Sequence, residues 1–358
     1  MKKRLLAVAA ALSLLLCGCS AMLERDYLQI TPHTTNPTAE GDPSVLKAES
    51  YQELVNALMY FITQGAETGA VRLYWDKETI EGDLEKACLE VIQEDPLGAY
   101  AVDYIKYSVN PMVSYSEADV QITYRRTREQ VASIVSATGT AAIRSELETA
   151  LAAFAPERVL RISYFDRDEE YIRALCREAY LATPATALDM PEVTVSIYPD
   201  QGRQRIVEIG LTYRLDSTEL EHRRDTLARA IQALTQPLSE KPAEAKLSEL
   251  PGLLADTVKY DPAAGSTAYH ALVEGSANSQ GLALALASLC ESVELNSLVV
   301  SGEWNGLPHF WIVLQTQAGW RHLDPTENGI YFGTDNQAAE AGYSWSGQNI
   351  PACTAAPR

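Results

Sequence analysis

Residues 274–290 read EGSANSQGLALALASLC and decide how the C-terminal part of the chain folds. The run from Leu282 to Cys290 is apolar on nearly every side, which predicts a helix buried in the middle of a domain. Ser279 lies at the predicted start of this helix, where backbone N–H groups have no partner and the helix dipole is positive. Such a position lowers the pKa of a thiol and can stabilise an oxyanion. It suits a nucleophile, yet the residue is a serine and the nearest cysteine is Cys290.

Three predicted strands follow this helix. They read SLVVSGEW, HFWIVLQT and GWRHLD, at residues 297–304, 309–316 and 319–324. His309 opens the second strand and Asp324 closes the third. A histidine and an aspartate in these places could complete a nucleophile–base–orienter arrangement with Ser279.

In order and spacing, this region resembles the transglutaminase-like superfamily, which has a papain-related α+β fold. The resemblance covers residues 250–330 and rests on Tyr269, Gly275, Ser279, Gly281, Ala283, His309, Trp311, Trp320, Asp324, Pro325 and Thr326. It implies a catalytic triad at Ser279, His309 and Asp324. Tyr269, Trp311 and Trp320 are candidates for lining a cleft, although aromatic residues on core strands usually belong to the core.

The departures from the family pattern concern the chemistry. Ser279 stands where the family has its cysteine, Leu282 replaces a tyrosine and Ile312 replaces a frequent asparagine. A thiol becomes a thiolate beside imidazolium, whereas a serine hydroxyl needs a well-aligned neutral histidine, and an error near 1 Å costs about 100-fold. We therefore expect a site without cysteine chemistry. The alternative is a serine-dependent hydrolase or acyl transferase that uses Ser279, His309 and Asp324.

A metal site is another interpretation of the same region. His309, His322 and Asp324 are possible ligands, and His322 and Asp324 share a strand face. No Cys-x-x-Cys or His-x-x-x-His spacing supports them, so the sequence predicts neither a metal nor a cofactor. His270 is expected to pack or to lie at the surface.

The N-terminus has the features of an export signal. Basic residues 2–4 precede an apolar segment of 12 residues at 5–16, and a membrane-spanning helix needs about 20. LCGC at 16–19 resembles the lipobox of bacterial lipoproteins, which implies cleavage after residue 18 and acylation of Cys19. A secretory signal with a chance cysteine is the alternative. We predict a signal peptide at 1–18, a lipid-anchored tether at 19–48, and a location on the extracytoplasmic face of the cell membrane.

The net charge argues against a nucleic-acid-binding protein, and the cysteine content argues against a fold held together by disulfides. The formal net charge is −19, and an acidic surface does not suit phosphate backbones, so no nucleic-acid partner is expected. Besides the anchor, the mature chain has only Cys88, Cys176, Cys290 and Cys353, which is too few for a disulfide framework.

Two similar segments precede the C-terminal region. Tyr74-Trp75-Asp76 matches Tyr164-Phe165-Asp166, and Cys88 matches Cys176 at an offset of 88 (176 − 88). Matches at a nearly constant offset predict tandem α-β-α-β-β repeats at 49–130 and 140–228, before a transglutaminase-like α+β domain at 240–358.

The sequence thus predicts a membrane-anchored lipoprotein with an α+β fold. Its expected function is recognition of a peptide, protein or cell-wall component.

Overall fold

The computed structural model describes residues 37, 39–40, 42–326, 331–346 and 349–354. Helices and sheets are mixed, so the α+β class is confirmed. The chain forms two compact units, residues 1–131 and 132–358. Cys19, the predicted signal peptide and most of the predicted tether lie outside the described residues. No helix among the described residues is both long enough and apolar enough to span a membrane.

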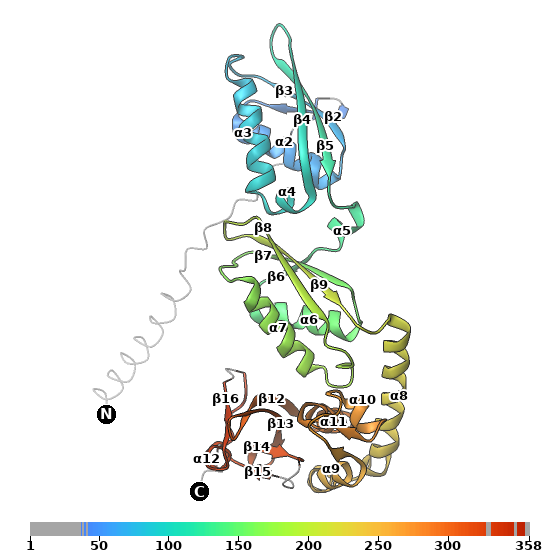
Figure 1. The fold of residues 1–358 in the computed structure, drawn as a ribbon. Coiled ribbons are helices and arrows are strands. Elements are labelled where there is room, and N and C mark those ends of the chain that lie inside the picture. Colours follow the sequence, from blue (N-terminus) through green and yellow to red (C-terminus); the bar gives the residue numbers. More distant parts are fainter. Residues whose placement is uncertain (1–36, 38, 41, 327–330, 347–348, 355–358) are drawn as a thin grey trace, which may run out of the picture. The chain divides into compact units, whose positions relative to one another are not determined.

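The first unit is a five-stranded sheet with helices packed against it (Figure 1). Its elements are β1 Ala39–Glu40, β2 Asp42–Ala48, α2 Tyr51–Gln64, β3 Thr68–Leu73, α3 Ile80–Gln93, α4 Pro96–Ala101, β4 Val102–Pro111 and β5 Ser116–Tyr124, and α5 Arg128–Ala132 follows. The strand order is β1-β2-β3-β5-β4, with β2 and β3 parallel and the other pairs antiparallel. Along β5, Ala118, Val120 and Ile122 are buried while Asp119 and Gln121 are exposed, so one face of the sheet is apolar.

The N-terminal half of the second unit contains a four-stranded sheet. Its elements are β6 Val135–Ala137, α6 Thr140–Ala152, β7 Glu157–Ile162, α7 Glu169–Ala182, β8 Glu192–Tyr198, β9 Arg205–Thr212 and α8 Ser217–Thr235. The order β6-β7-β9-β8 and the strand directions correspond to β2-β3-β5-β4 of the first unit. The predicted α-β-α-β-β order omitted the strand before the first helix of each module. β6 is only three residues long, and β2 lies within residues 19–48, which were predicted to be a tether. The tandem duplication stays a prediction.

The C-terminal half of the second unit is built around one buried helix. Its elements are η1 Gln236–Leu238, α9 Ala243–Thr257, β10 Lys259–Tyr260, α10 Ala268–Leu272, β11 Ser276–Ala277, α11 Ser279–Ser292, β12 Ser297–Trp304, β13 Leu307–Thr316, β14 Gly319–Asp324, β15 Tyr331–Gly333, α12 Asp335–Glu340 and β16 Tyr343–Trp345. Five of the strands form an antiparallel sheet in the order β15-β14-β13-β12-β16, and β10 and β11 pair in parallel as a separate sheet. The predicted buried helix and the three strands after it are confirmed.

Successive side chains of β13 point to opposite faces of the sheet and pack in two different apolar clusters. Ile312 and Leu314 belong to the large core that contains α11, whereas Trp311 and Val313 belong to a smaller cluster on the other face of the sheet. The large core also includes Leu160 of β7 and Leu227 of α8, so it continues across the predicted boundary between residues 228 and 240.

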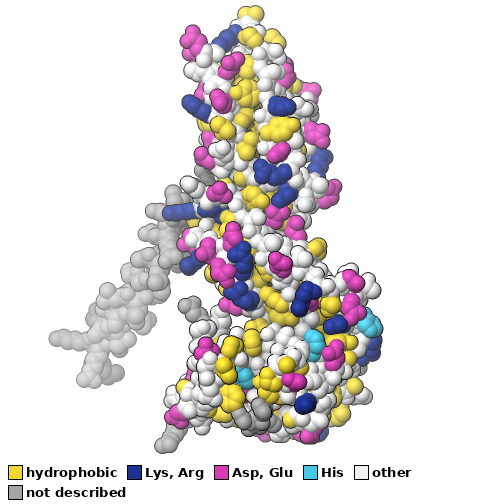
Figure 2. Space-filling view, viewed as in Figure 1, with side chains coloured by type: hydrophobic (Ala, Val, Ile, Leu, Met, Phe, Trp, Pro, Cys, Tyr) yellow, Lys and Arg dark blue, Asp and Glu magenta, His cyan; other side chains and the backbone are white. Residues whose placement is uncertain are grey.

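The surface carries both signs of charge. On the face in view, Figure 2 shows Lys and Arg side chains interspersed with Asp and Glu over both units. The acidic balance of the sequence therefore does not gather into one patch on that face.

Truncating a buried side chain of α11 is expected to destabilise the second unit. Leu286 is completely buried, so Leu286→Ala should lower the free energy of unfolding by about 2–5 kcal/mol. Leu307 of the same unit is 70% exposed, and Leu307→Ala should change it by no more than about 0.5 kcal/mol. Urea unfolding followed by tryptophan fluorescence makes the comparison. Equal effects of the two substitutions would contradict the buried position of α11.

Candidate functional site

Ser279 is the first residue of α11 and is 8% exposed. Asn278 caps the helix, because its side-chain oxygen accepts the Gly281 N–H at 3.1 Å. At Gly281 a Cβ atom would lie only 2.7 Å from the Cβ of Ala277, so only glycine fits this close approach. The local sequence thus holds the serine at a tightly packed helix start.

The hydroxyl of Ser279 is bound to the backbone of β13. Its Oγ accepts the N–H of Phe310 at 3.3 Å. Phe310 directly follows His309, so the helix start and the predicted base are neighbours. Among the described residues, no hydrogen bond joins Ser279 Oγ to the His309 ring.

His309 and Asp324 form a buried pair. The His309 Nε2–H donates to Asp324 Oδ2 at 2.7 Å, and both side chains are nearly inaccessible to solvent. Asp324 Oδ1 accepts the Thr326 N–H at 3.1 Å. Because Nε2 carries the proton that Asp324 accepts, a neutral His309 has its lone pair on Nδ1. The structure therefore brings together the two residues that the sequence predicted as base and orienting acid.

Tyr343 completes this pair and was not predicted. Its hydroxyl donates to Asp324 Oδ2 at 2.8 Å. Burial, and then the charge of Asp324, raise the pKa of Tyr343, so the phenol stays protonated and remains a donor. Tyr343 lies on β16, beyond the last residue of the family pattern, and no spacing in the sequence indicates it.

Aromatic rings enclose the imidazole of His309. The ring centroids of Trp304, Trp311 and Tyr343 lie 5.6, 6.3 and 6.1 Å from its centroid. These contacts restrict the rotation of the imidazole and exclude water from the His309–Asp324 bond. The orientation of the His309 ring is thus set by packing as well as by Asp324.

The three predicted cleft residues are in different environments. Trp311 is completely buried and belongs to the core, so it does not line an open cleft. Tyr269 lies on α10, with the Arg223 guanidinium 4.9 Å from its ring centroid. Trp320 lines a cavity at the far end of α11 from Ser279. The structure therefore does not gather these residues at one cleft.

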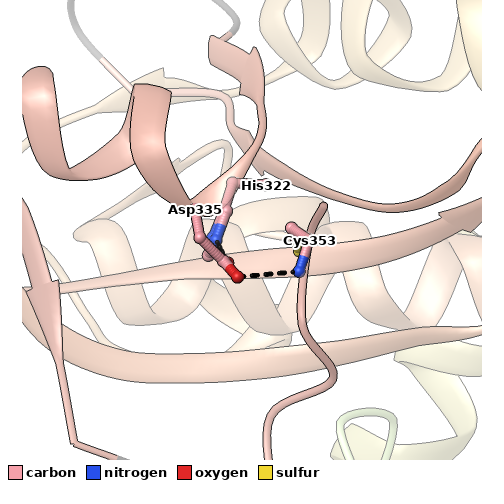
Figure 3. A group of neighbouring side chains, drawn as sticks. All are labelled: His322, Asp335 and Cys353. Carbon is pink, nitrogen blue, oxygen red and sulfur yellow. Dashed lines mark hydrogen bonds and ion pairs between the residues drawn. The ribbon is translucent and has the colours of Figure 1, made fainter. Parts of the chain in front are cut away.

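A second polar cluster, the C-terminal clamp, consists of Trp311, His322, Asp335 and Cys353. The Trp311 indole N–H donates to His322 Nδ1 at 2.8 Å, and His322 Nε2 bonds Asp335 Oδ1 at 2.9 Å. The Cys353 N–H donates to Asp335 Oδ2 at 3.0 Å, as Figure 3 shows. The clamp ties residues near the C-terminus to β14 and α12.

The clamp has three potential metal ligands within 4.8 Å of one another, in His322, Asp335 and Cys353. An indole N–H can only donate, so Trp311 leaves His322 with its lone pair on Nδ1 and its proton on the nitrogen that faces Asp335. Both ring nitrogens of His322 are thus engaged, which suits a hydrogen-bonded structural cluster better than a metal centre. The other metal interpretation is not supported, because His322 bonds Trp311 and Asp335 rather than Asp324.

Acid is expected to destabilise the second unit through His322. Burial lowers the pKa of His322 from its usual value of 6.5, and Asp335 opposes this shift only in part. The unfolded chain therefore binds the proton more tightly, so this contribution to stability is complete above pH 6.5 and is lost as the pH falls below that value.

The measurement is urea unfolding at about pH 7.5 and 5.5, in wild type and in His322→Gln. Glutamine can accept from Trp311 and donate to Asp335 without titrating. Wild type should lose more stability on acidification than the variant. The same loss in both proteins would show that His322 is not the acid-sensitive group.

No protein-family model matches the chain, and no curated protein matches it. Among solved structures, it is similar to a TGase, with 14% identity, a TM-score of 0.27, and coverage of 48% of this chain and 51% of that one. LapG of Legionella pneumophila matches with 13% identity and a TM-score of 0.26, over 37% of this chain and 75% of that one. A protein of Cytophaga hutchinsonii, proposed to be a cysteine protease, matches with 13% identity and a TM-score of 0.26, over 44% and 71%. The chain thus spans about half the length of the TGase that it matches.

Proposed function

We propose that the protein is a lipoprotein, anchored through Cys19 to the extracytoplasmic face of the cell membrane. In this proposal its transglutaminase-like region recognises a peptide, protein or cell-wall component and does not catalyse acyl transfer. One observation carries the second part: Ser279 Oγ accepts a backbone N–H from Phe310 and, among the described residues, makes no hydrogen bond to His309.

The physical argument concerns how a hydroxyl becomes a nucleophile. Its pKa is far above neutral, so attack requires a histidine that removes the proton as the bond forms. That histidine must be aligned with the hydroxyl, and small misplacements reduce the rate steeply. At the position where the resemblance to the transglutaminase-like superfamily implies a cysteine, the Ser279 hydroxyl accepts a hydrogen bond from the Phe310 backbone instead. This supports a site that binds without reacting.

A serine-dependent hydrolase or acyl transferase is the second candidate, and the His309–Asp324–Tyr343 arrangement favours it. Asp324 and Tyr343 hold His309 in the tautomer with a free lone pair on Nδ1, which is the form that a general base needs. The two candidates therefore differ only in whether Ser279 engages that lone pair.

Fluorophosphonate probes separate the two candidates, because they capture only activated serines. Wild-type protein should remain unlabelled under conditions in which a known serine hydrolase is labelled completely. Ser279→Ala and His309→Ala serve as matched controls for any weak labelling. Stoichiometric labelling of wild type that is lost in both variants would replace the recognition proposal with the serine enzyme.

The anchor rests on the N-terminal sequence. Removal of residues 1–18 takes away the three basic residues at 2–4 and would change the formal net charge from −19 to −22 (−19 − 3). Acyl chains contribute about 0.8 kcal/mol per buried methylene, so a diacylated Cys19 would hold the acidic mature chain stably on a bilayer.

We further propose that residues 49–130 and 140–228 arose by duplication. The shared strand order β2-β3-β5-β4 and β6-β7-β9-β8 supports this proposal and extends each module to the strand just before it, β2 or β6. Cys88 and Cys176, both buried in α3 and α7, support it as well. An experimental structure should superpose the two modules over their shared elements, and different topologies would contradict the duplication.

A further inference from the structure

A cavity of about 570 Å³ lies within the second unit, at the C-terminal end of α11. Its walls come from the end of α7, the end of α11, the start of β12, and Trp320 of β14. Ser279 and Glu291 are 12 residues apart on α11, which places them about 18 Å apart along the helix axis. The volume is within the usual range for ligand sites, about 300–1,000 Å³. The cavity is therefore separate from the site around His309.

The charge at the cavity is negative. Glu291 and Glu294 line it, both are exposed, and no cationic side chain is among the residues that line it. Among the described residues, neither carboxylate forms an ion pair. The nearby Lys246 Nζ donates instead to the Val293 carbonyl, at 3.2 Å. Lys246 thus already occupies the C-cap carbonyl of α11, and the two carboxylates of the lining are the groups that favour a cation.

The remaining walls are apolar. Leu181, Pro184, Leu298, Val299 and Trp320 line the cavity, and Trp320 also packs against the cluster that contains Trp311. A hydrated metal ion gains nothing from such walls, because calcium and magnesium require several oxygen ligands. A flexible aliphatic chain that ends in an ammonium group matches both the apolar walls and the two carboxylates. Its methylenes pack on apolar surface, and its charge interacts with carboxylates and with an aromatic ring.

We infer that this cavity binds the side chain of a lysine, or of a similar diamino acid, in a peptide or protein partner. The inference rests on the proposed recognition function and names the chemistry of the partner, but it does not involve Ser279. In the bound state the ammonium group lies between Glu291 and Glu294, and the aliphatic stem lies against Trp320 and Leu298.

The probe is the peptide acetyl-Ala-Ala-Lys-Ala-Ala-amide, titrated by calorimetry into the full chain in detergent. The matched probe carries Nε-acetyllysine at the same position, which keeps the stem and removes the charge. Binding of the acetylated peptide should be weaker by about tenfold, because two carboxylate contacts and a cation–π contact are lost. Glu291→Gln/Glu294→Gln should weaken the lysine peptide by a similar factor.

A control variant separates a local effect from net charge. Glu221→Gln/Glu340→Gln also removes two negative charges, from exposed positions outside the lining of the cavity, and should leave binding unchanged. Trp320→Phe should bind the lysine peptide more weakly than wild type but more tightly than the double glutamine variant.

Three results would overturn the inference. They are equal affinity for the two peptides, no binding of the lysine peptide at millimolar concentration, and equal weakening by the cavity variant and its control. Fluorophosphonate labelling of Ser279 would instead overturn the recognition proposal and leave the lysine site standing. If fluorophosphonate does not label the protein and the lysine peptide does not bind, only the lysine site is overturned and the recognition proposal stands.

Discussion

Ser279→Cys is expected to create a thiol that iodoacetamide modifies about 1,000-fold faster than the other cysteines of the described structure. The new sulfur would lie at the N-terminus of α11 beside His309, and both features favour the thiolate. Burial raises the pKa of Cys88 to about 11 and the pKa values of Cys176, Cys290 and Cys353 to about 12. Near pH 8, a thiol with a pKa near 12 is ionised in only about one molecule in 10,000.

A matched variant isolates the contribution of the histidine. Gln280→Cys places a thiol one residue further into the same helix turn, with the same dipole but a different direction. It should react faster than Cys290 and more slowly than Ser279→Cys. Adding His309→Ala to Ser279→Cys should lower the rate to that of Gln280→Cys. Mass spectrometry of each peptide over time gives the rates, and a Ser279→Cys thiol as slow as Cys290 would disprove the predicted environment.

Cys19→Ala is expected to abolish lipid attachment completely. The resemblance to a lipobox makes Cys19, and not Cys17, the acylated residue, and it implies that cleavage after residue 18 depends on that modification. The variant should remain as an uncleaved precursor without incorporated fatty acid. Growth with labelled palmitate, followed by detergent phase partitioning, measures both properties.

Cys17→Ala provides the matched control, since it removes a cysteine two residues earlier in the same segment. It should be cleaved and labelled like wild type. Equal fatty-acid incorporation by wild type and Cys19→Ala would show that the resemblance to a lipobox is accidental.

The sequence allowed prediction of those parts whose signal is local. The apolar run at 282–290 predicted α11, and the segments at 297–304, 309–316 and 319–324 predicted β12 to β14. His309 and Asp324 could be predicted to meet because each stands at the end of an adjacent strand. Helix starts and strand ends are encoded within a few residues of the groups that they position.

Other features depend on contacts between distant segments, which periodicity does not reveal. Tyr343 reaches Asp324 from β16, 19 residues along the chain (343 − 324), and Cys353 reaches Asp335 from beyond the sheet. Trp311 was predicted as a possible cleft residue, yet it is buried beneath Tyr343 and Trp345. The hydroxyl of Ser279 bonds to the Phe310 backbone, and no sequence pattern predicts a contact of that kind.

The large core that runs from β7 through α8 to α11 and β13 has a consequence for how the second unit unfolds. Leu227 and Ile231 of α8 contribute to the same core as Leu282 and Leu286, so neither half can lose its structure without exposing the apolar surface of the other. The two halves should therefore melt as one cooperative transition. A ligand held between α7 and β12 would then raise the melting temperature of all of residues 135–345, because it binds only the folded form.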